Sequence, residues 1–504
     1  MRCLTLATAL RQKGAQALFV GREHFGHLCE QIAERGFMAA RLPAILERPA
    51  DDATIEGDAP PHAHWLGASW KQDAEETQEA IRKAFGAADW LVVDHYALDE
   101  RWEKALRPCA QRLMVIDDLA DRAHDCDLLL DQNFFRDGDK RYAGRTPPHC
   151  GLMLGPHYAL LQPEYAELRE CIPPREESFR RILVSFGAAD ANNLAGMAIE
   201  AFLSLDRSDV ELDVVANPNG PHAEGLRRQT AARSNIHLHG ALPSLAPLMA
   251  QADLAIGACG ATTWERLCLG LPSLVITLAD NQRQIAAELA RQGAICLLGH
   301  VGEVDVAALA RVLRELVNEG LPEAWSRACR ELVDGRGTSR VCSALTLSPD
   351  ASLRARPARL DDEALLLQWA NDPLVRQNAF STAAIDSATH HAWFRERLRD
   401  LGNCRLYVVE TEEGFPVGQV RFERRGPEWE IDYSLDRSCR GRGLGRPMLE
   451  TAMLTLRSSE AGAVVRGRVK AANAASRRVF EGLGFGAKNT IGTHGEGIVF
   501  SKAL

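Results

Sequence analysis

The amino-acid sequence predicts an α/β protein with two doubly wound domains, followed by a smaller α+β domain. In the N-terminal part, short apolar runs that end in polar residues alternate with helical segments. This alternation is typical of parallel sheets covered by helices. The chain has 504 residues, which is too long for one hydrophobic core. A glycine-rich turn between strands near the C-terminus indicates a separate third unit.

The first domain is expected to cover residues 1–160. Leu4, Leu6, Ala7 and Leu10 predict an opening helix that ends at Gly14. The strands expected in this domain are Ala17–Val20, Trp90–Val93 before Asp94-His95-Tyr96, Leu113–Ile116 before Asp117-Asp118, and Leu128–Leu130 before Asp131-Gln132-Asn133. The chain therefore begins inside a helix, although the first strand of a doubly wound sheet is usually central and the turn after it usually contacts ligand. We expect that this strand is missing.

The second domain, residues 161–345, contains the most informative segment of the chain. Its earlier strands are expected at Arg181–Phe186 before Gly187-Ala188-Ala189-Asp190, at Glu211–Val215 and at His237–Leu242. The apolar run Leu254–Ile256 then leads into a glycine-spaced turn, Gly257 to Gly260, and a helix that opens at Thr262. Glycines at a strand end let backbone N–H groups approach a ligand, and a helix start favours an anion. The turn therefore suits a diphosphate.

A purely structural explanation accounts for the same turn equally well. Thr262 and Glu265 have the spacing of a capping box, and the glycines suit any tight turn. The next apolar run, Ser273–Leu278, ends in a polar loop, Asp280-Asn281-Gln282. This loop is expected at the same edge of a parallel sheet, which favours a nucleotide site.

The third unit, residues 353–504, has its own signature. The strand Trp429–Leu435 precedes Arg440-Gly441-Arg442-Gly443-Leu444-Gly445 and a helix, Pro447–Leu456. A second strand, Val464–Val469, is followed by Asn473 and a last helix, Arg477–Leu483. Backbone amides of the glycine turn and the helix start, with arginines beside them, suit a pyrophosphate.

This strand–turn–helix pair resembles the acetyl-CoA-binding half of the GNAT N-acetyltransferases. The resemblance implies that acetyl-CoA is the cosubstrate. It also implies a pyrophosphate turn and an asparagine that contacts the pantetheine arm; the residues in question are Leu435, Arg440, Gly441, Arg442, Gly443, Leu444, Gly445 and Asn473. The segments Trp369–Arg376 and His391–Trp393 resemble the acceptor side of family members that act on amino sugars, although an ordinary pair of amphipathic helices explains them nearly as well.

Many GNAT enzymes carry a tyrosine in the last helix as general acid, but this chain has Phe480 there. Glu430 and Asp432 share one face of a strand because their spacing is two. Either a buried carboxylate with a raised pKa or a water that it orders is expected to take the amine proton. Alternatively, both are plain surface acids.

Composition excludes several other classes. The net charge of −9 argues against a general nucleic-acid binder. No apolar run approaches the roughly 20 residues of a membrane helix. The 13 cysteines show no CxxC pair or zinc-ligand spacing, so we expect reduced thiols in a cytoplasmic protein. Asp117, Asp118 and Asp131 end successive strands, but nothing else resembles a hard-cation site, and no metal is expected.

The first 340 or so residues resemble the UDP-sugar hydrolases of pseudaminic acid biosynthesis. These enzymes share the two-domain GT-B fold of the glycosyltransferase that makes lipid II, with two Rossmann-like halves. The matching segments are Arg2–Ala7, Asp94–Tyr96, Val115–Leu119, Cys126–Asp131, Tyr158–Leu161, Ser185–Gly187 with Asp190, and Asp253–Gln282. The C-terminal domain resembles the N-acetyltransferase that acts one step earlier in that pathway.

The two resemblances together imply consecutive reactions. The C-terminal domain is expected to acetylate the 4-amino group of a UDP-linked dideoxy-amino-altrose. The N-terminal pair is then expected to hydrolyse the UDP-diacetamido-trideoxy-altrose to free sugar and UDP. Residues implied to bind the UDP-sugar are Gly187, Gly257, Gly260, Thr262, Thr263, Glu265 and Gln282, with Glu265 on the ribose hydroxyls. Tyr96 and Asn281 are implied to lie near the sugar and the attacking water, although Tyr96 also suits a packing role.

Family members open with a strand and a Gly-x-Gly-His turn whose histidine is the proposed catalytic base. This chain starts just after that turn. We expect that translation starts upstream, because loss of a central strand should exceed the net stability of a typical domain, roughly 5–15 kcal/mol. As written, the hydrolase half is expected to be impaired while the acetyltransferase half works.

Two other interpretations of the N-terminal pair remain open. It is a glycosyltransferase if it passes the sugar from UDP to an acceptor other than water. It is a non-catalytic UDP-sugar-binding module if it binds without turnover and serves the acetyltransferase.

Overall fold

A computed structural model of the chain describes all residues except 45–59, 174, 176–179, 188, 189, 232, 241, 493 and 494. The segments expected at Gly187–Asp190 and His237–Leu242 therefore lie partly outside the described residues. The chain divides into two compact units. One comprises Met1–Pro148 and Leu152–Ser339, and the other comprises His149–Gly151 and Arg340–Leu504.

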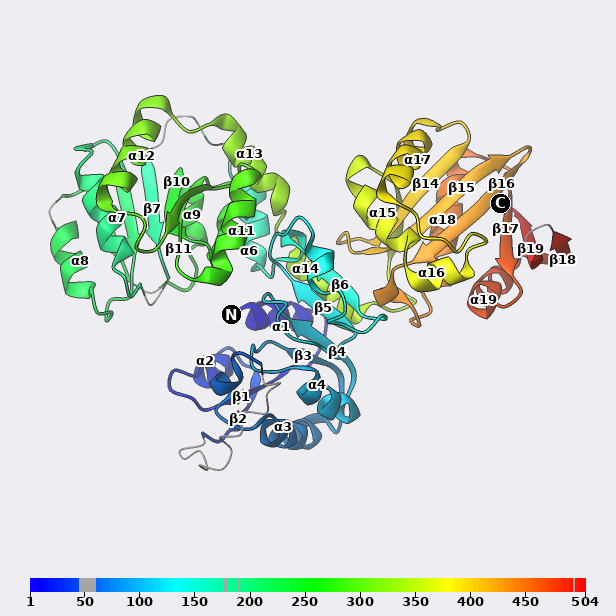
Figure 1. The fold of residues 1–504 in the computed structure, drawn as a ribbon, viewed down its shortest axis with the longest axis horizontal. Helices are drawn as coiled ribbons and strands as arrows, with labels where there is room; N and C mark the ends of the chain where they lie inside the picture. Colours follow the sequence, from blue (N-terminus) through cyan, green and yellow to red (C-terminus); the bar gives the residue numbers. More distant parts are fainter. Residues whose placement is uncertain are drawn as a thin grey trace. The chain divides into compact units, whose positions relative to one another are not determined.

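The N-terminal part of the first unit contains two separate sheets (Figure 1). The strands β1 (Leu18–Arg22) and β2 (Met38–Leu42) pair in parallel. A four-stranded sheet has the order β3-β4-β5-β6, with β3, β4 and β5 parallel. Its strands are β3 (Ala88–Val93), β4 (Ala110–Ile116), β5 (Leu128–Asp131) and β6 (Gly151–Leu154).

The helices of this part follow the alternation expected from the sequence. The opening helix α1 buries Leu4, Leu6 and Ala7 and ends just before Gly14, which has a φ of 88°. In α3, the Ser69 side chain accepts the N–H of Gln72 and so caps the helix start. The helices are α1 (Arg2–Gln12), α2 (Cys29–Glu34), α3 (Trp70–Phe85), α4 (Glu100–Leu106), α5 (Gly138–Arg141) and α6 (Pro163–Cys171), with short 3-10 turns at Ala63–Leu66, Arg107–Cys109 and Pro156–Tyr158.

The second part of this unit is a six-stranded sheet with the order β12-β11-β10-β7-β8-β9, all parallel. Counted along the chain, this is the strand order 3-2-1-4-5-6 of a Rossmann fold. Every residue of β10 and β11 is buried, as expected for strands with helices on both faces (Figure 1). The strands are β7 (Arg181–Ser185), β8 (Glu211–Val215), β9 (Ile236–His239), β10 (Leu254–Ala258), β11 (Ser273–Thr277) and β12 (Cys296–His300).

The helices around this sheet are α7 (Leu194–Leu203), α8 (Ala223–Thr230), α9 (Ala246–Gln251), α10 (Thr262–Cys268), α11 (Asp280–Arg291), α12 (Val306–Glu319) and α13 (Glu323–Leu332). One apolar core extends through this part, from Ala159 to Val333. The prediction of a polar loop at Asp280-Asn281-Gln282 is wrong, because these residues form the first turn of α11. Polar residues suit a helix start as well as a loop, so composition did not separate the two.

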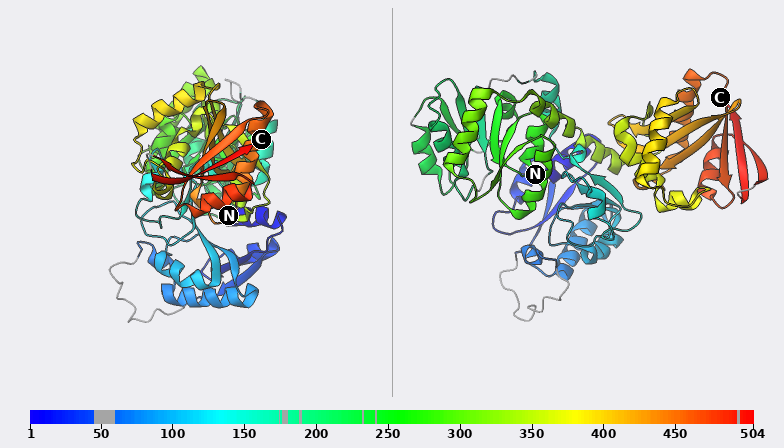
Figure 2. Two further views of the ribbon diagram at one scale, coloured as in Figure 1. Left: turned by 90° about the vertical axis from the view of Figure 1, so that its right-hand side faces the viewer. Right: turned by 45° about the horizontal axis from the view of Figure 1, so that its top comes forward.

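The second unit is a seven-stranded sheet with helices packed on it. The order is β13-β14-β15-β16-β17-β19-β18, and only the β16–β17 pairing is parallel. Figure 2 shows its last hairpin, in red, at one edge. The strands are β13 (Leu353–Pro357), β14 (Cys404–Thr411), β15 (Pro416–Arg425), β16 (Glu428–Leu435), β17 (Val464–Lys470), β18 (Gly486–Gly492) and β19 (Gly495–Ala503).

The helices of the C-terminal part are α14 (Gly337–Thr346), α15 (Glu363–Ala370), α16 (Pro373–Asn378), α17 (Ser387–Arg399), α18 (Gly445–Ser459) and α19 (Ala474–Gly482), with 3-10 turns at Leu360–Asp362 and Arg437–Cys439. Among the described residues of the chain, none of the helices combines the length and the hydropathy of a membrane span. No disulfide joins any of the 13 cysteines, all of which are described.

Candidate functional site

The first candidate site lies where the strand order of the six-stranded sheet reverses. The central neighbours β7 and β10 run parallel, and their connections leave in opposite directions along the sheet. Ligands of such sheets bind in the crevice beyond the carboxyl ends of these two strands. Gly187 follows β7 with a φ of 86°, and the turn Gly257–Gly260 follows β10. The structure therefore brings these glycines to one sheet edge.

The two glycines of the β10 turn are required for different reasons. A Cβ on Gly257 would lie 2.3 Å from Nη1 of Arg266 and 2.5 Å from the carbonyl oxygen of Ser185. Gly257 is therefore a glycine because protein atoms fill the space of a side chain. A Cβ on Gly260 would meet no atom within 4 Å. The open space at Gly260 is where a ligand can approach the backbone.

Arg266 lies in the protein interior behind this turn, with 2% of its surface exposed. Its Nη2 donates to the carbonyl of Ala258 (2.7 Å) and to the hydroxyl of Thr263 (3.1 Å), while its Nε has no hydrogen-bond partner. No carboxylate among the described residues lies within ion-pair distance of it. Burial lowers the pKa of Arg266. The Glu265 carboxylate acts on this guanidinium electrostatically and opposes the effect of burial, but it forms no direct ion pair with it.

The capping box that the structural explanation predicts from Thr262 and Glu265 is not formed. The N-cap of α10 is Ala261, and no side chain caps the helix. The Thr263 hydroxyl donates instead to the carbonyl of Ala258 (3.3 Å), which ties the helix start to the end of β10. Helix α10 has seven residues, so the N–H groups of the turn matter more here than a long helix dipole.

Glu265 lies half-buried near the same turn. Burial raises its pKa, and a hydrogen bond with the Tyr165 hydroxyl partly offsets this effect. Tyr165 is itself 1% exposed and comes from α6, outside the segment that the sequence singled out. A fixed carboxylate of this kind is a suitable acceptor for the paired hydroxyls of a ribose.

Asn281 and Gln282 begin α11 at the carboxyl end of β11, the neighbour of β10. The Oε1 of Gln282 accepts the N–H of Leu278 (2.9 Å), so this side chain closes the turn after the strand. Asn281 is exposed. The structure therefore places both residues at the predicted edge, and it leaves Asn281 the more accessible of the two.

Tyr96 lies after β3 in a cluster of aromatic and charged side chains. Its ring centroid is 5.9 Å from those of His62 and Trp65. Burial and the Asp118 carboxylate raise the pKa of Tyr96. Arg2, at the start of α1, contacts both Asp94 (2.6 Å) and Asp118 (3.2 Å). Tyr96 therefore has the packing contacts of the structural alternative and also a polar environment.

The acidic residues at the strand ends of this sheet are neutralised by neighbouring side chains. Asp117 pairs with Arg122 (2.9 Å), Asp131 pairs with Arg141, and the Tyr142 hydroxyl contacts Asp131 (3.1 Å). Within the described part of the chain, no group of three or more His, Cys, Asp or Glu side chains is arranged to hold a metal ion. These carboxylates instead build an internal ion-pair network.

The second candidate site is a cavity of about 1320 Å³ in the C-terminal unit. Its walls come from β15, β16, β17, α18, α19 and the helices α15 to α17. Of the residues expected to bind acetyl-CoA, those that line it are Leu435, Arg440, Gly441, Gly443, Leu444, Gly445 and Asn473. The cavity also contains both carboxylates predicted to act in catalysis, Glu430 and Asp432.

The two arginines of the glycine turn have different surroundings. Arg440 lines the cavity, but its Nε and Nη2 donate to the carbonyl of Leu435 (3.2 and 3.1 Å) and its Nη1 pairs with Asp372 (2.8 Å). It therefore braces the turn from within. Arg442 is 8% exposed and donates to the carbonyl of Ala344 (2.5 Å). The Arg442 side chain therefore points into the protein, so any contact of this residue with coenzyme A is left to its backbone.

The backbone of the turn suits a pyrophosphate. Gly441 and Gly443 adopt φ values of 73° and 76°, which L side chains rarely adopt. Helix α18, of 15 residues, begins at Gly445 and has no side-chain cap. Arg446, in its first turn, lines the cavity. Arg446 is not among the residues that the sequence predicts for the site, although an arginine one residue after the glycine turn, at a helix start, indicates an anion-binding side chain.

Asn473 caps the last helix and lines the cavity. Its Oδ1 accepts the N–H of Ser476 (3.1 Å), which leaves the amide nitrogen for other partners. The side chain that is predicted to contact a pantetheine arm thus also fixes the start of α19.

Glu430 and Asp432 are not buried, which excludes the buried carboxylate and leaves the alternatives of a water that they order or of plain surface acids. Their side chains are 35% and 58% exposed. Arg425 and Arg468 lie 3.5 and 3.8 Å from Glu430, and Arg421 lies 3.8 Å from Asp432. The strand faces the cavity mouth, where water reaches both carboxylates.

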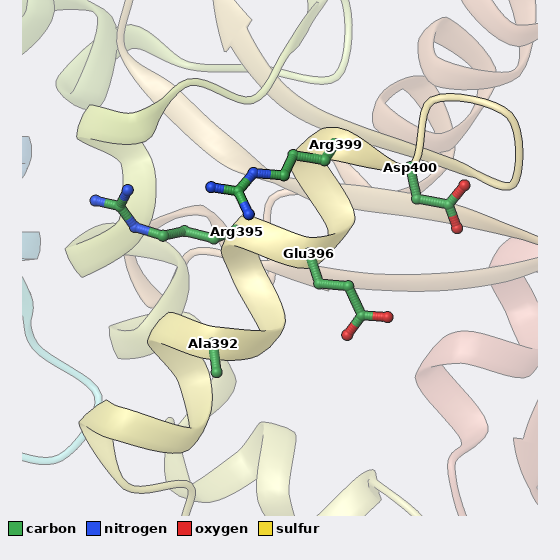
Figure 3. Close-up of a pocket in the computed structure, with 5 residues that line it drawn as sticks. All are labelled: Ala392, Arg395, Glu396, Arg399 and Asp400. Atoms are coloured by element: carbon green, nitrogen blue, oxygen red, sulfur yellow. The ribbon is translucent and has the colours of Figure 1, made fainter.

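The acceptor-side segments are only partly at the cavity. Trp393 lines it, and the Arg421 guanidinium lies 5.1 Å from the centre of its ring. Trp369 lies in the hydrophobic core, and its Nε1 donates to the Asp436 carboxylate (2.7 Å). His391 lies on the surface and pairs with Glu363 (2.7 Å). Figure 3 shows a separate hollow of about 520 Å³ along α17, lined by Ala392, Arg395, Glu396, Arg399 and Asp400. Of the predicted acceptor-side segments, Ala392 lines that hollow, and none of the residues predicted for catalysis or for binding of UDP-sugar or acetyl-CoA does.

Comparison with known proteins assigns both parts of the chain. Residues 352–486 match the acetyltransferase (GNAT) domain family, and residues 182–332 match the glycosyltransferase family 28 C-terminal domain. The spore coat polysaccharide biosynthesis protein SpsG of Bacillus subtilis is 31% identical over 211 residues, which are 41% of this chain and 62% of that protein.

A second relative is the UDP-N-acetylglucosamine–N-acetylmuramyl-(pentapeptide) pyrophosphoryl-undecaprenol N-acetylglucosamine transferase of an Exiguobacterium species. It is 27% identical over 215 residues, which are 40% of this chain and 59% of that protein. The chain thus covers less than two thirds of either relative. The crystal structure of MurG from Acinetobacter baumannii has a TM-score of 0.47 and 15% identity, covering 68% of this chain and 94% of that one.

The predicted fold class and the fusion of two unrelated parts are confirmed. The chain joins a GT-B-like region, related to the C-terminal domain of family 28 glycosyltransferases, to a C-terminal GNAT acetyltransferase domain.

Proposed function

We propose that the chain is a bifunctional nucleotide-sugar enzyme of pseudaminic acid biosynthesis. Its GNAT domain transfers an acetyl group from acetyl-CoA to the 4-amino group of a UDP-linked amino-dideoxy sugar. Its GT-B-like region then hydrolyses the UDP-diacetamido-trideoxy-altrose to free sugar and UDP. The observation that carries this proposal is the presence of two open glycine turns in one chain, at Gly260 and at Gly441, each with the groups that a pyrophosphate ligand needs beside it.

The acetyl-CoA site is supported by the cavity in the C-terminal unit. About 1320 Å³ is ample for a cosubstrate arm together with part of an acceptor. The uncapped start of α18 and Arg446 supply N–H groups and positive charge to the pyrophosphate. The amine of the acceptor attacks the thioester carbonyl, and its proton passes to water at the mouth, ordered by Glu430 and Asp432.

The UDP site is supported by the strand-order reversal and by Glu265. The ribose hydroxyls donate to Glu265, which Tyr165 holds in place. The diphosphate lies on the turn at Gly260, in front of the charge of Arg266. A relative that is named as a UDP-N-acetylglucosamine transferase and another named for polysaccharide biosynthesis favour a nucleotide-sugar ligand.

The hydrolytic step needs water at the anomeric carbon of the sugar. Tyr96 and Asn281 are the proposed residues near this water, and Gln282 fixes the turn beside them. The C1–O bond to UDP breaks as the water oxygen bonds to C1, and the water gives up one proton to solvent. The departing diphosphate is stabilised by the backbone N–H groups of the Gly257–Thr263 turn.

The test is to incubate the protein with acetyl-CoA and a UDP-linked 4-amino-4,6-dideoxy sugar, and to follow products by mass spectrometry. We expect first a mass gain of one acetyl group and then release of UDP with free diacetamido sugar, the second reaction being the slower because the hydrolase half is expected to be impaired. Polyamines and free amino sugars serve as controls for the acceptor. Acetylation of the controls alone would contradict the proposed substrate.

The family 28 match favours one alternative, a glycosyltransferase that passes the sugar to an acceptor other than water. Hydrolysis and transfer differ in the fate of the sugar, since only hydrolysis run in ¹⁸O-labelled water gives free sugar that carries the label. Release of UDP without labelled free sugar would favour transfer.

A further inference from the structure

The last helix of the GNAT domain carries no hydroxyl where many relatives have a tyrosine. Phe480 lies in α19 with 2% of its surface exposed, and its ring centroid is 4.9 Å from that of Phe485 and 5.1 Å from that of Phe500. A Cβ on Gly467 would lie 2.4 Å from Cζ of Phe480. The tip of the Phe480 ring therefore presses on the backbone of β17, and no proton donor is present at this place.

A tyrosine from another element lies next to it. The ring of Tyr433, in β16, meets the Phe480 ring edge-on at 5.9 Å. The Tyr433 hydroxyl is 2.6 Å from Oγ of Ser476, in the first turn of α19. The N–H of Ser476 is bound by Asn473, which fixes this serine. Tyr433, Ser476 and Phe480 all line the cavity.

The position of Tyr433 in its strand places this hydroxyl pair where the two central strands part. The parallel pairing of β16 with β17 ends at Ile431 and Gly467. Tyr433 lies two residues beyond that last pair, on the stretch that leads to the glycine turn at Arg440–Gly445. A pantetheine arm that extended from that turn into the cavity would pass between the parted strands. Its thioester would then lie close to the hydroxyl pair.

We propose that Tyr433, held by Ser476, is the general acid that protonates the departing thiolate of coenzyme A. The inference rests on the proposed acetyltransferase activity. As the amine nitrogen bonds to the acetyl carbon, the C–S bond breaks and its electron pair goes to sulfur. The Tyr433 O–H bond breaks as the S–H bond forms. The phenolate then recovers a proton from solvent through the Ser476 hydroxyl, while the amine proton leaves to water at the mouth.

The environment of Tyr433 keeps the donor protonated until it is needed. Burial raises the pKa of Tyr433 to about 12, and the hydrogen bond with Ser476 acts against this rise. The proton is therefore present at neutral pH. The charged side chains that line the same cavity come from several elements, together with the imidazole of His390. They are Arg376, Arg421, Glu423, Arg425, Glu430, Asp432, Arg440, Arg446, Arg468, Lys470 and Arg478.

The first test does not depend on the acceptor. Coenzyme A is bound to the protein, and its thiol is titrated through the ultraviolet absorbance of the thiolate, in wild type and in Tyr433→Phe. A phenolic donor stabilises the thiolate, so we expect the ionisation constant of the bound thiol to fall about 10-fold in Tyr433→Phe. An unchanged titration would overturn the proposal, even if the enzyme acetylates its substrate.

The second test is kinetic and uses a matched control. Tyr407, in β14, is also buried and also hydrogen-bonds with a serine, Ser459, but it does not line the cavity. With the UDP-linked amino sugar, Tyr433→Phe is expected to lower kcat about 100-fold with little change in KM for acetyl-CoA. Tyr407→Phe is expected to retain kcat.

The variant Ser476→Ala and the double variant Tyr433→Phe with Ser476→Ala test whether the two hydroxyls act together. If the two hydroxyls act as one unit, the double variant is no slower than Tyr433→Phe alone. Fluorotyrosines at position 433 lower the phenol pKa at nearly constant volume, and the alkaline limb of the kcat profile is expected to move to lower pH with them. A Tyr433→Phe enzyme with more than half of the wild-type kcat, or an alkaline limb that stays in place, would refute the proposal.

Discussion

Arg266 brings a positive charge into the interior directly behind the turn of the proposed UDP site. A buried ion costs several kcal/mol unless it is compensated, and here the protein supplies hydrogen bonds to Ala258 and Thr263 and the attraction of the Glu265 carboxylate, without a direct ion pair. A diphosphate on the other side of the turn would supply the missing negative charge through a medium of low dielectric constant. We therefore expect Arg266 to act on the ligand without touching it.

This expectation distinguishes an effect of the Arg266 charge on the ligand from an effect of its side chain on the shape of the turn. In Arg266→Met, affinity for UDP should fall about 10-fold while affinity for uridine stays unchanged, because only the diphosphate senses the charge. The free energy of unfolding without ligand should change by less than about 1 kcal/mol, since the lost hydrogen bonds are offset by removal of a buried cation that has no direct ion pair. Calorimetric titration and denaturant unfolding measure both quantities, with Arg266→Lys as the control that keeps the charge. Equal losses for UDP and uridine would mean that Arg266 only holds the turn.

Glu265 gives a second prediction, on the pH dependence of UDP binding. Burial raises its pKa, and a protonated carboxyl accepts fewer hydrogen bonds from the ribose hydroxyls. Wild-type affinity for UDP should therefore weaken as the pH falls through this raised pKa. Glu265→Gln should bind UDP about 10- to 100-fold more weakly and lose this pH dependence over the acidic range. A glutamine variant with the same acid limb would exclude Glu265 as its origin.

The sequence could not reveal the directions of several of these side chains. The glycine turn and its arginines were recognised at Arg440–Gly445, but the Arg442 side chain lies under Ala344 instead of in the cavity. Gly257 is imposed by Arg266, nine residues away, and not by a ligand. Tyr433 and Ser476 meet across 43 positions of sequence. Contacts of this kind follow from tertiary packing, which no local spacing encodes.

At the scale of elements, a buried network joins α4 to the loop after β4. His124 Nδ1 is 2.7 Å from Glu103, and Asp117 pairs with Arg122 (2.9 Å). Burial disfavours the imidazolium, but the Asp117 and Glu103 carboxylates outweigh this effect and raise the pKa of His124 to about 9. The protonated histidine is therefore part of the folded structure at neutral pH.

Because of this network, the free energy of unfolding is expected to fall as the pH rises into the alkaline range. The folded-state pKa lies above the unfolded value of 6.5, so the contribution of His124 is complete below about pH 6.5 and is lost as the pH rises through about 9. The free energy of unfolding of the N-terminal unit should fall by on the order of 3 kcal/mol across this window. In His124→Gln the slope should be shallower, and the variant should be less stable at pH 6.5. Parallel curves for the two proteins would assign the slope to other groups.

Elements were more predictable than side chains. The strand expected at Leu254–Ile256 is β10 (Leu254–Ala258), and the helix expected at Thr262 begins there. Uninterrupted apolar runs identify buried parallel strands because both faces are covered. The start of α11 at Asp280 was missed because Asp, Asn and Gln also suit loops. The two separate sheets of the N-terminal part depend on strand pairing, which apolar runs do not specify.

At the scale of the whole molecule, the chain consists of two compact units, and each carries one of the two proposed reactions. The two proposed sites lie in different units and share no residues, so the effects of substitutions in them are expected to be additive. Glu265→Gln should therefore slow UDP release at low substrate concentration by about 10- to 100-fold and leave the acetylation rate within about twofold, and Arg446→Ala should instead slow acetylation and leave UDP release within about twofold. Acetylation and UDP release are assayed separately with each variant. A slower acetylation in Glu265→Gln would instead support a binding module that serves the acetyltransferase.

The parting of β16 and β17 beyond Ile431 and Gly467 has a consequence for the C-terminal unit without its cosubstrate. A sheet that opens in its middle leaves amide and carbonyl groups on two facing edges to be solvated by water. The pantothenate and cysteamine amides of coenzyme A can pair with these edges as a short extra strand would. Binding of coenzyme A would then join the two halves of the sheet beyond their last backbone pair. The cosubstrate would thus both take part in the reaction and stabilise the fold.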